Sequence, residues 1–157
     1  MTRITRKVWI WCGTASVAVA LAIQVVPYGR NHENPPVTRE PAWDSPATRE
    51  LAKRACFDCH SNETEWPVYA SIAPVSWLVQ HDVTEGRGVL NFSEWQRSQE
   101  GAKDASEEVL QREMPPATYR FVHAHARLST VEMERLANGL VKTMGVLAAE
   151  QHQEREP

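Results

Sequence analysis

Three observations predict an all-α protein. Apolar residues recur at spacings of three and four along several segments, as in amphipathic helices. Alternating apolar and polar runs, which would indicate strands, are scarce. The chain has 157 residues, 42% of them hydrophobic and 24% charged, which is typical of a globular protein and sufficient for one core rather than two.

The first predicted element is a membrane-spanning helix over residues 8–26. This stretch has no charged residue, and at ~1.5 Å rise per residue it crosses most of a ~30 Å hydrocarbon core. Trp9 and Trp11 fit the headgroup region on one side of the bilayer, and Tyr28 fits it on the other. We therefore predict a single N-terminal transmembrane helix.

The flanking charges predict the orientation of this helix. Arg3, Arg6 and Lys7 precede it, so the positive-inside tendency places the N-terminus in the cytoplasm and the remainder in the periplasm, held at a bacterial inner membrane. A cleaved signal peptide is the alternative, because residues 20–22 form a small-x-small cleavage site. The retained anchor is favoured since the apolar run exceeds the roughly 7 to 15 residues of a signal core. Residues 1–29 are thus an anchor or signal segment.

An extended tether and the main domain follow. Residues 30–44 carry three prolines among polar residues, which is typical of an extended linker. Ser45 before Pro46 predicts the capped start of the first helix of the domain. We expect this domain to cover residues 45–150 and a tail to cover 151–157.

Further helices are delimited by breaking residues. The first runs over about 46–55, and the second begins at Pro74 and is ended by Gly86 and Gly88. A third spans about 102–112 and is closed by two prolines. A capping box begins the last helix, whose apolar stripe keeps helical spacing. The box is Ser129 with Glu132, and the stripe is Met133, Leu136, Leu140, Met144 and Leu147.

The strongest chemical signal is the CxxCH segment, in which two cysteines and an adjacent histidine stand within five residues. Cys56 and Cys59 can form thioethers to a haem while His60 binds its iron. A zinc site would need a fourth ligand, and a thioredoxin-like redox pair would need a βαβ setting. Cys12, the third cysteine, lies in the apolar segment. We therefore predict one covalently attached haem c.

The sixth ligand of the iron is left open between several residues. Met114 stands directly before two prolines, where a helix must end and a thioether can approach the iron, although methionines also fill cores. His81, His123 and His125 compete for the role. The proline context favours Met114.

Neighbouring residues are expected to support the site. A ligating imidazole normally donates its second N–H to an acceptor, and the Pro74 carbonyl is the candidate acceptor for His60. Trp77, Trp95 and Tyr119 could line the haem edge or bind its propionates, with simple core packing as the alternative.

Several longer motifs resemble a known family. The segments are NPPV from Asn34, then EPAWDSP, RACFDCHSNETEWPVY, IAPVSWLVQHDV, LNFSEW, MPPATY and ARLS. Over about residues 30–145 the chain resembles the bacterial haem-binding domain family of cytochrome c-like proteins. The resemblance implies a class I cytochrome c-like fold, haem attachment through Cys56, Cys59 and His60, and axial ligation by Met114. The final helix lacks the tryptophan expected in this family.

Charge and chemistry together predict the function. The net charge of −3 becomes −6 when the three N-terminal cations are removed, which argues against a nucleic-acid surface and for a basic protein partner. The expected function is single-electron transfer between periplasmic redox partners of unknown identity, without a catalytic residue. A third possibility is a haem-bearing interaction subunit that its anchor holds near a larger respiratory or oxidase complex.

The alternative function is a haem-based peroxidase or a gas or redox sensor with an open distal site. Peroxidase chemistry needs a distal base and a nearby cation. His81 or His123 with Arg120 or Arg127 are the candidates. The electron carrier is favoured over the catalyst, because nothing in the spacing of these histidines and arginines requires a distal catalytic site.

Overall fold

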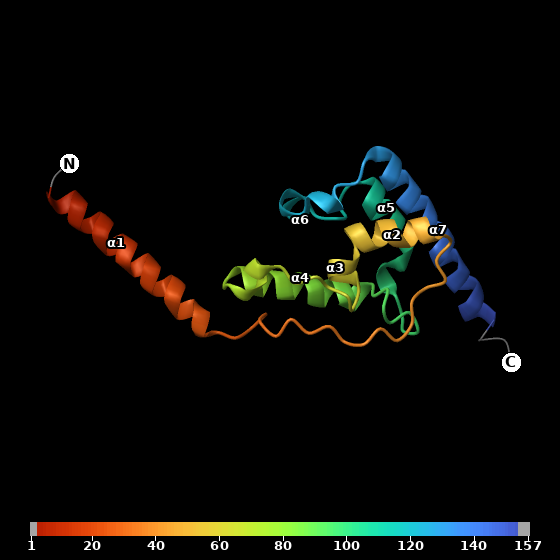
Figure 1. Ribbon diagram of the computed structural model, residues 1–157, viewed down its shortest axis with the longest axis horizontal. Coiled ribbons are helices and arrows are strands. Elements are labelled where there is room, and N and C mark those ends of the chain that lie inside the picture. Colours follow the sequence, from red (N-terminus) through yellow and green to blue (C-terminus); the bar gives the residue numbers. More distant parts are fainter. Residues whose placement is uncertain (1–2, 154–157) are drawn as a thin grey trace. The chain divides into compact units, whose positions relative to one another are not determined.

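The chain is built from helices, as predicted. The computed structural model describes the backbone of residues 3–153 and the side chains of residues 7–145. Within this part there are α-helices and short 3-10 helices, no strand, and one isolated bridge between Arg39 and Glu94 (Figure 1). Contacts divide the chain into two compact units: one up to residue 33 together with 66–82, the other 34–65 together with the chain from 83 onward.

The first unit contains the predicted apolar helix. Helix α1 covers Arg3–Ala22 and continues as the 3-10 helix η1, Ile23–Val25. The stretch Lys7–Val25 has a mean hydropathy of 1.8 and none of it is buried, so it is long and apolar enough to cross a membrane. The unit also holds η2, Val68–Ser71, and the start of α4, Val75–Val89.

In the second unit, helix α2 leads into the CxxCH segment and the single turn α3 lies within it. Helix α2, Pro46–Ala55, begins as predicted, with the Ser45 hydroxyl accepting the Thr48 N–H at 3.2 Å. The single turn α3, Phe57–His60, follows after Cys56. The later elements are η3 (Glu100–Lys103), α5 (Ala105–Leu110), α6 (Ala117–Val122), η4 (Ala124–Ala126) and α7 (Thr130–Gln153).

The core of the second unit lies where α2 and α5 pack against α7 (Figure 1). Leu136 and Leu140 of the predicted stripe are fully buried, and each such side chain contributes roughly 1.5 to 3 kcal/mol by leaving water. Met133 is buried, Met144 packs against the cluster, and the Leu147 side chain lies outside the described residues. The capping box is confirmed: the Ser129 N–H donates to Glu132 at 2.8 Å and the Glu132 N–H to Ser129 at 3.3 Å.

Two predicted helix ends are wrong. Helix α4 continues through Gly86 and Gly88 to Val89, because Gly86 lies where the helix touches another segment rather than where it stops. Helix α5 ends at Leu110 instead of about 112, because Arg112 has a φ of 62° and therefore leaves the right-handed helical region.

Residues 38–45, which precede α2 within the second unit, are extended and are bonded to the turn over 91–95. The Thr38 and Arg39 N–H groups donate to the Ser93 carbonyl at 2.9 and 3.1 Å, and the Trp95 N–H donates to Arg39 at 2.9 Å. The Trp43 ring lies 5.0 Å from that of Phe92. This part of the expected tether therefore supports the turn over 91–95.

Candidate functional site

One helical turn brings together the three residues of the CxxCH segment. The Cys59 and His60 N–H groups both donate to the Cys56 carbonyl, at 3.2 and 2.9 Å. Cys56 stands at the N-cap of this turn, so the backbone hydrogen bonds hold the three residues close together. Neither cysteine is in a disulfide. Burial, and secondarily the charge of Cys59, raise the pKa of the Cys56 thiol to about 12, so this thiol is protonated at neutral pH.

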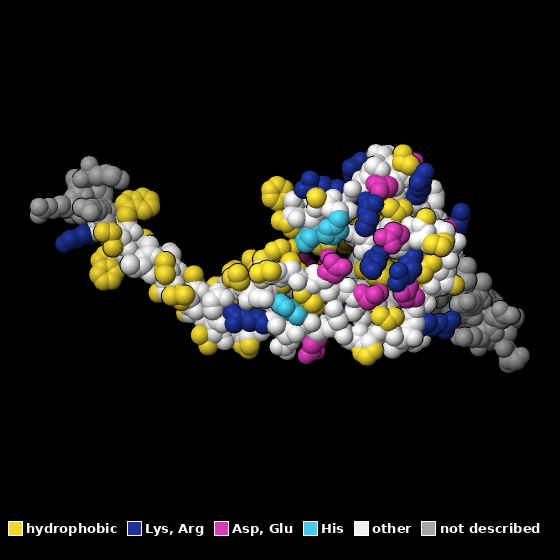
Figure 2. Space-filling view, viewed as in Figure 1, with side chains coloured by type: hydrophobic (Ala, Val, Ile, Leu, Met, Phe, Trp, Pro, Cys, Tyr) yellow, Lys and Arg dark blue, Asp and Glu magenta, His cyan; other side chains and the backbone are white. Residues whose placement is uncertain are grey.

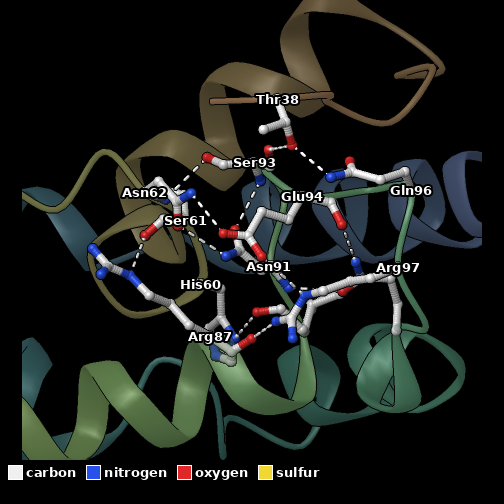
Figure 3. Close-up of polar contacts among 12 residues, drawn as sticks. Thr38, His60, Ser61, Asn62, Arg87, Asn91, Ser93, Glu94, Gln96 and Arg97 are labelled. Atoms are coloured by element: carbon white, nitrogen blue, oxygen red, sulfur yellow. Dashed lines mark hydrogen bonds and ion pairs between the residues drawn. The ribbon is translucent and has the colours of Figure 1, made fainter. Parts of the chain in front are cut away.

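The surroundings of His60 fix its protonation. Its Nδ1 lies 3.0 Å from the Gly86 carbonyl oxygen and 3.1 Å from that of Leu90 (Figure 3). Carbonyl oxygens only accept hydrogen bonds, so Nδ1 carries the proton. Burial lowers the pKa of His60 and keeps the ring neutral, which leaves the lone pair of Nε2 available to a metal. The imidazole is thus held in the tautomer that an iron ligand requires.

The predicted acceptor for His60 is wrong. The Pro74 carbonyl instead accepts the N–H groups of Trp77 and Leu78, at 3.1 and 3.4 Å, in the first turn of α4. The acceptors come from the last turns of the same helix, through Gly86 and Leu90.

Gly86 permits this approach. A Cβ on Gly86 would lie 2.5 Å from the Cys59 carbonyl oxygen, so only glycine lets α4 come so near α3. A glycine inside a helical pattern, rather than at its end, was the signal in the sequence that could have revealed the contact.

Arg87, the next residue of α4, fixes the chain that leaves the histidine. Its Nε donates to the Ser61 carbonyl at 2.8 Å (Figure 3). Its Nη2 donates to Asn34 Oδ1 and Thr64 Oγ1, both at 2.9 Å. One guanidinium therefore ties helix α4 to both sides of the CxxCH segment.

A buried polar network completes this support (Figure 3). The Asn62 N–H donates to Ser93 Oγ, and the Asn91 amide donates to Asn62 Oδ1, each at 2.9 Å. The Asn62 amide in turn donates to Glu94 at 2.9 Å, and the Phe92 N–H donates to the His60 carbonyl at 2.8 Å. Since buried polar groups are costly unless paired, this satisfied network specifies one arrangement of the turn 91–94 against His60.

A hydrogen bond joins the Met114 segment to the CxxCH segment. The Tyr119 hydroxyl, on α6, donates to Oδ2 of Asp58, which stands between the two cysteines. The other carboxylate oxygen of Asp58 accepts the Glu65 N–H at 2.9 Å. Met114 lies five residues before Tyr119 and is 37% exposed, so it does not fill the core. We call the Tyr119–Asp58 bond the latch.

The other candidates for the sixth ligand or a distal site are His81, His123, His125, Arg120 and Arg127. His123 and the two arginines make contacts with residues 112–121. The His123 ring stacks on Tyr119 with centroids 4.0 Å apart, and His125 and His81 are exposed. Arg120 donates to the Arg112 carbonyl at 2.9 Å. Arg127 donates to the carbonyls of Arg120 and Phe121, at 2.7 and 2.9 Å.

The three aromatic residues expected around a haem have different environments. Trp95 is 4% exposed and stacks on Phe92, which is the core-packing alternative. The Tyr119 hydroxyl is bonded to Asp58. The Trp77 indole N–H is buried without a hydrogen-bond partner among the described residues.

The zinc and thioredoxin-like alternatives lack their structural requirements. Among the side chains described, no three His, Cys, Asp or Glu residues are grouped to hold a metal ion. The backbone of 3–153 contains no strand that could build a βαβ unit. The geometry at His60 instead suits one protein ligand to a metal whose remaining ligands lie outside the CxxCH segment.

Gly86→Ala tests the close approach of α4. The added Cβ would push the helix off the Cys59 carbonyl and lengthen both His60 hydrogen bonds, so we expect a loss of about 1 to 3 kcal/mol in the free energy of unfolding. Urea unfolding of the purified full chain measures it. Gly88→Ala is the matched control, because a Cβ there meets nothing within 4 Å and alanine suits a helix better than glycine. Equal losses in the two variants would contradict the assignment.

Comparison with known proteins gives one match, to a protein family. A family model described as a haem-binding domain matches residues 18–142, which include the CxxCH segment, the acceptors of His60 and Met114. No curated protein and no solved structure gives a match. The chain therefore belongs to the haem-binding domain family.

Proposed function

We propose that this protein is a membrane-anchored c-type cytochrome that transfers single electrons. The observation that carries the proposal is the neutral His60 with Nδ1 bonded to two carbonyls and Nε2 left for iron. Cys56 and Cys59 would hold one haem through thioethers, each thiol adding across a vinyl group so that sulfur binds one carbon and its proton goes to the other. When bound, the haem supplies the one-electron couple.

A class I cytochrome c-like fold accords with the second unit. Helix α2, which leads into the attachment segment, packs against the C-terminal helix α7, as terminal helices do in that fold. The anchor supports an exported location. Helix α1 would hold the protein in an inner membrane with its N-terminus cytoplasmic and the haem domain periplasmic, where covalent haem attachment takes place.

Met114 is proposed as the sixth ligand. It is partly exposed, it stands outside the core, and the latch ties its segment to the residue between the two attachment cysteines. A methionine ligand raises the reduction potential relative to a second histidine. Arg120 and Arg127 are bonded to backbone carbonyls, which supports an electron carrier over a peroxidase with a distal cation.

Haem staining on a denaturing gel tests covalent attachment. The full chain, produced in a host competent in cytochrome maturation, should stain for haem. Cys56→Ser combined with Cys59→Ser should abolish the stain, because no thioether can form. Cys12→Ser, which removes the exposed cysteine of α1, should stain like the unmodified chain. An unstained parent protein would refute the proposal.

Met114→Leu tests the sixth ligand while conserving side-chain volume. Loss of the thioether should remove the sulfur-to-iron charge-transfer band of the ferric protein and make the iron accessible to added imidazole. Met144→Leu, on α7, should change neither property. A Met114→Leu spectrum identical to that of the parent would assign the sixth position to another residue.

Tyr119→Phe tests the latch as a positioning device. Loss of a hydrogen bond to a carboxylate costs about 1.5 to 3 kcal/mol, which would raise the ratio of methionine-dissociated to methionine-bound iron roughly 10- to 100-fold. Titration of the ferric protein with imidazole measures this as tighter apparent binding. Asp58→Asn should give a smaller change in the same direction, because its amide offers one oxygen to the two donors, the Tyr119 hydroxyl and the Glu65 N–H. Unchanged imidazole affinity in Tyr119→Phe would show that the latch does not position Met114.

A further inference from the structure

We propose that residues 66–80 form a second membrane contact, lying in the headgroup region beside the end of the anchor helix. The inference rests on α1 spanning the bilayer, as proposed above. These fifteen residues include no Asp, Glu, Lys or Arg. They include the partly exposed Trp66 and Tyr69, and tryptophan and tyrosine are the residues enriched at membrane interfaces. We call this stretch the interfacial segment.

The interfacial segment buries three of its small residues, Ala70, Ala73 and Ser76, and exposes several aliphatic side chains. Ala70 and Ser76 are fully buried, whereas Val68 is 87% exposed, Ile72 55% and Leu78 59%. Figure 2 shows hydrophobic side chains gathered around the start of α4, and residues 68–78 run through η2 into this helix. A group of exposed aliphatic side chains within eleven residues marks an interaction surface rather than scattered surface residues.

Hydrogen bonds fix the segment beside the point where α1 ends. The Gln24 amide nitrogen donates to the Ala73 carbonyl at 2.8 Å, and its oxygen accepts the Ala73 N–H at 3.0 Å. Gln24 is one residue from the end of the apolar span at Val25. The backbone at Ala73 therefore lies within one side-chain length of the edge of the hydrocarbon core.

Further contacts hold the following chain on the same segment. The His32 ring stacks on Trp66 with centroids 4.8 Å apart, and its Nε2 lies 3.1 Å from the Ala70 carbonyl oxygen. Gly29 has a φ of 77°, and a Cβ there would overlap the Ser76 carbonyl. The chain leaving the membrane thus packs closely along residues 66–76 and keeps them at this depth.

A bilayer fits this surface better than a protein partner. The headgroup region is roughly 5 to 7 Å thick on each side, so a segment bonded at Gln24 lies within it. Val25 is 82% exposed and Val26 45%, which joins the lipid-facing surface of α1 to the exposed residues of the interfacial segment. A surface with apolar side chains and no charge buries its aliphatic groups at the acyl boundary without desolvating an ion.

Spin labels on the full-length holoprotein in phospholipid vesicles test the proposal. In a Cys12→Ser background, with Cys56 and Cys59 in thioethers, single cysteines are introduced as V68C and I72C. L21C reports the anchor, and V131C on α7 is the aqueous control, since Val131 is 56% exposed. The accessibility of each label to oxygen is compared with its accessibility to a water-soluble nickel complex. We expect the labels at 68 and 72 to give ratios closer to that of L21C than to that of V131C.

Each other outcome overturns the inference in a distinguishable way. Aqueous ratios at 68 and 72 with a lipid-like ratio at 21 would leave the anchor and remove the second contact. Labels at 68 and 72 that neither reagent reaches would show that haem, another protein or a second copy covers the surface. An aqueous ratio at 21 as well would refute the anchor itself, while haem staining of the same samples reports the cytochrome separately.

Discussion

The structure of the second unit depends on one shared hydrogen bond, from the Nδ1–H of His60 to the carbonyls of Gly86 and Leu90. It selects the tautomer of the imidazole and so decides which nitrogen can reach a metal. It also requires the last two turns of α4 to lie against the single turn α3. Many of the contacts around the CxxCH segment hold α3 and the end of α4 close enough for this hydrogen bond.

Three devices of different kinds serve this purpose. Gly86 removes the side chain that would separate the helices. Arg87 bonds the chain on both sides of the CxxCH segment, and the buried asparagines place the turn 91–94 under His60. The aromatic stack of Phe57, Phe92 and Trp95 supplies the apolar counterpart. Hydrogen bonds and aromatic packing therefore both hold the turn over 91–95 against the CxxCH segment.

Local patterns in the sequence predicted the elements whose causes are local. The Ser45 cap, the Ser129–Glu132 box and the stripe of α7 each depend on residues within a few positions, and the structure has them as expected. The acceptors of His60 could not be found in this way, since they lie 26 and 30 residues along the chain. The predicted helix stop at Gly86 is wrong because a glycine inside a helical pattern can also admit a neighbouring segment, here the Cys59 backbone. The latch was missed for a similar reason, since Asp58 and Tyr119 are 61 residues apart.

The order of these residues along the chain bears on how the protein matures. The two thiols and the imidazole are encoded together, whereas both acceptors of the imidazole come later and belong to another helix. If haem is attached as proposed, the unfolded chain would present both thiols and the imidazole before its tertiary structure forms. The Gly86 and Leu90 carbonyls of α4 and its end would then orient the His60 ring only once the chain has folded, so that the proposed attachment would not require the folded structure.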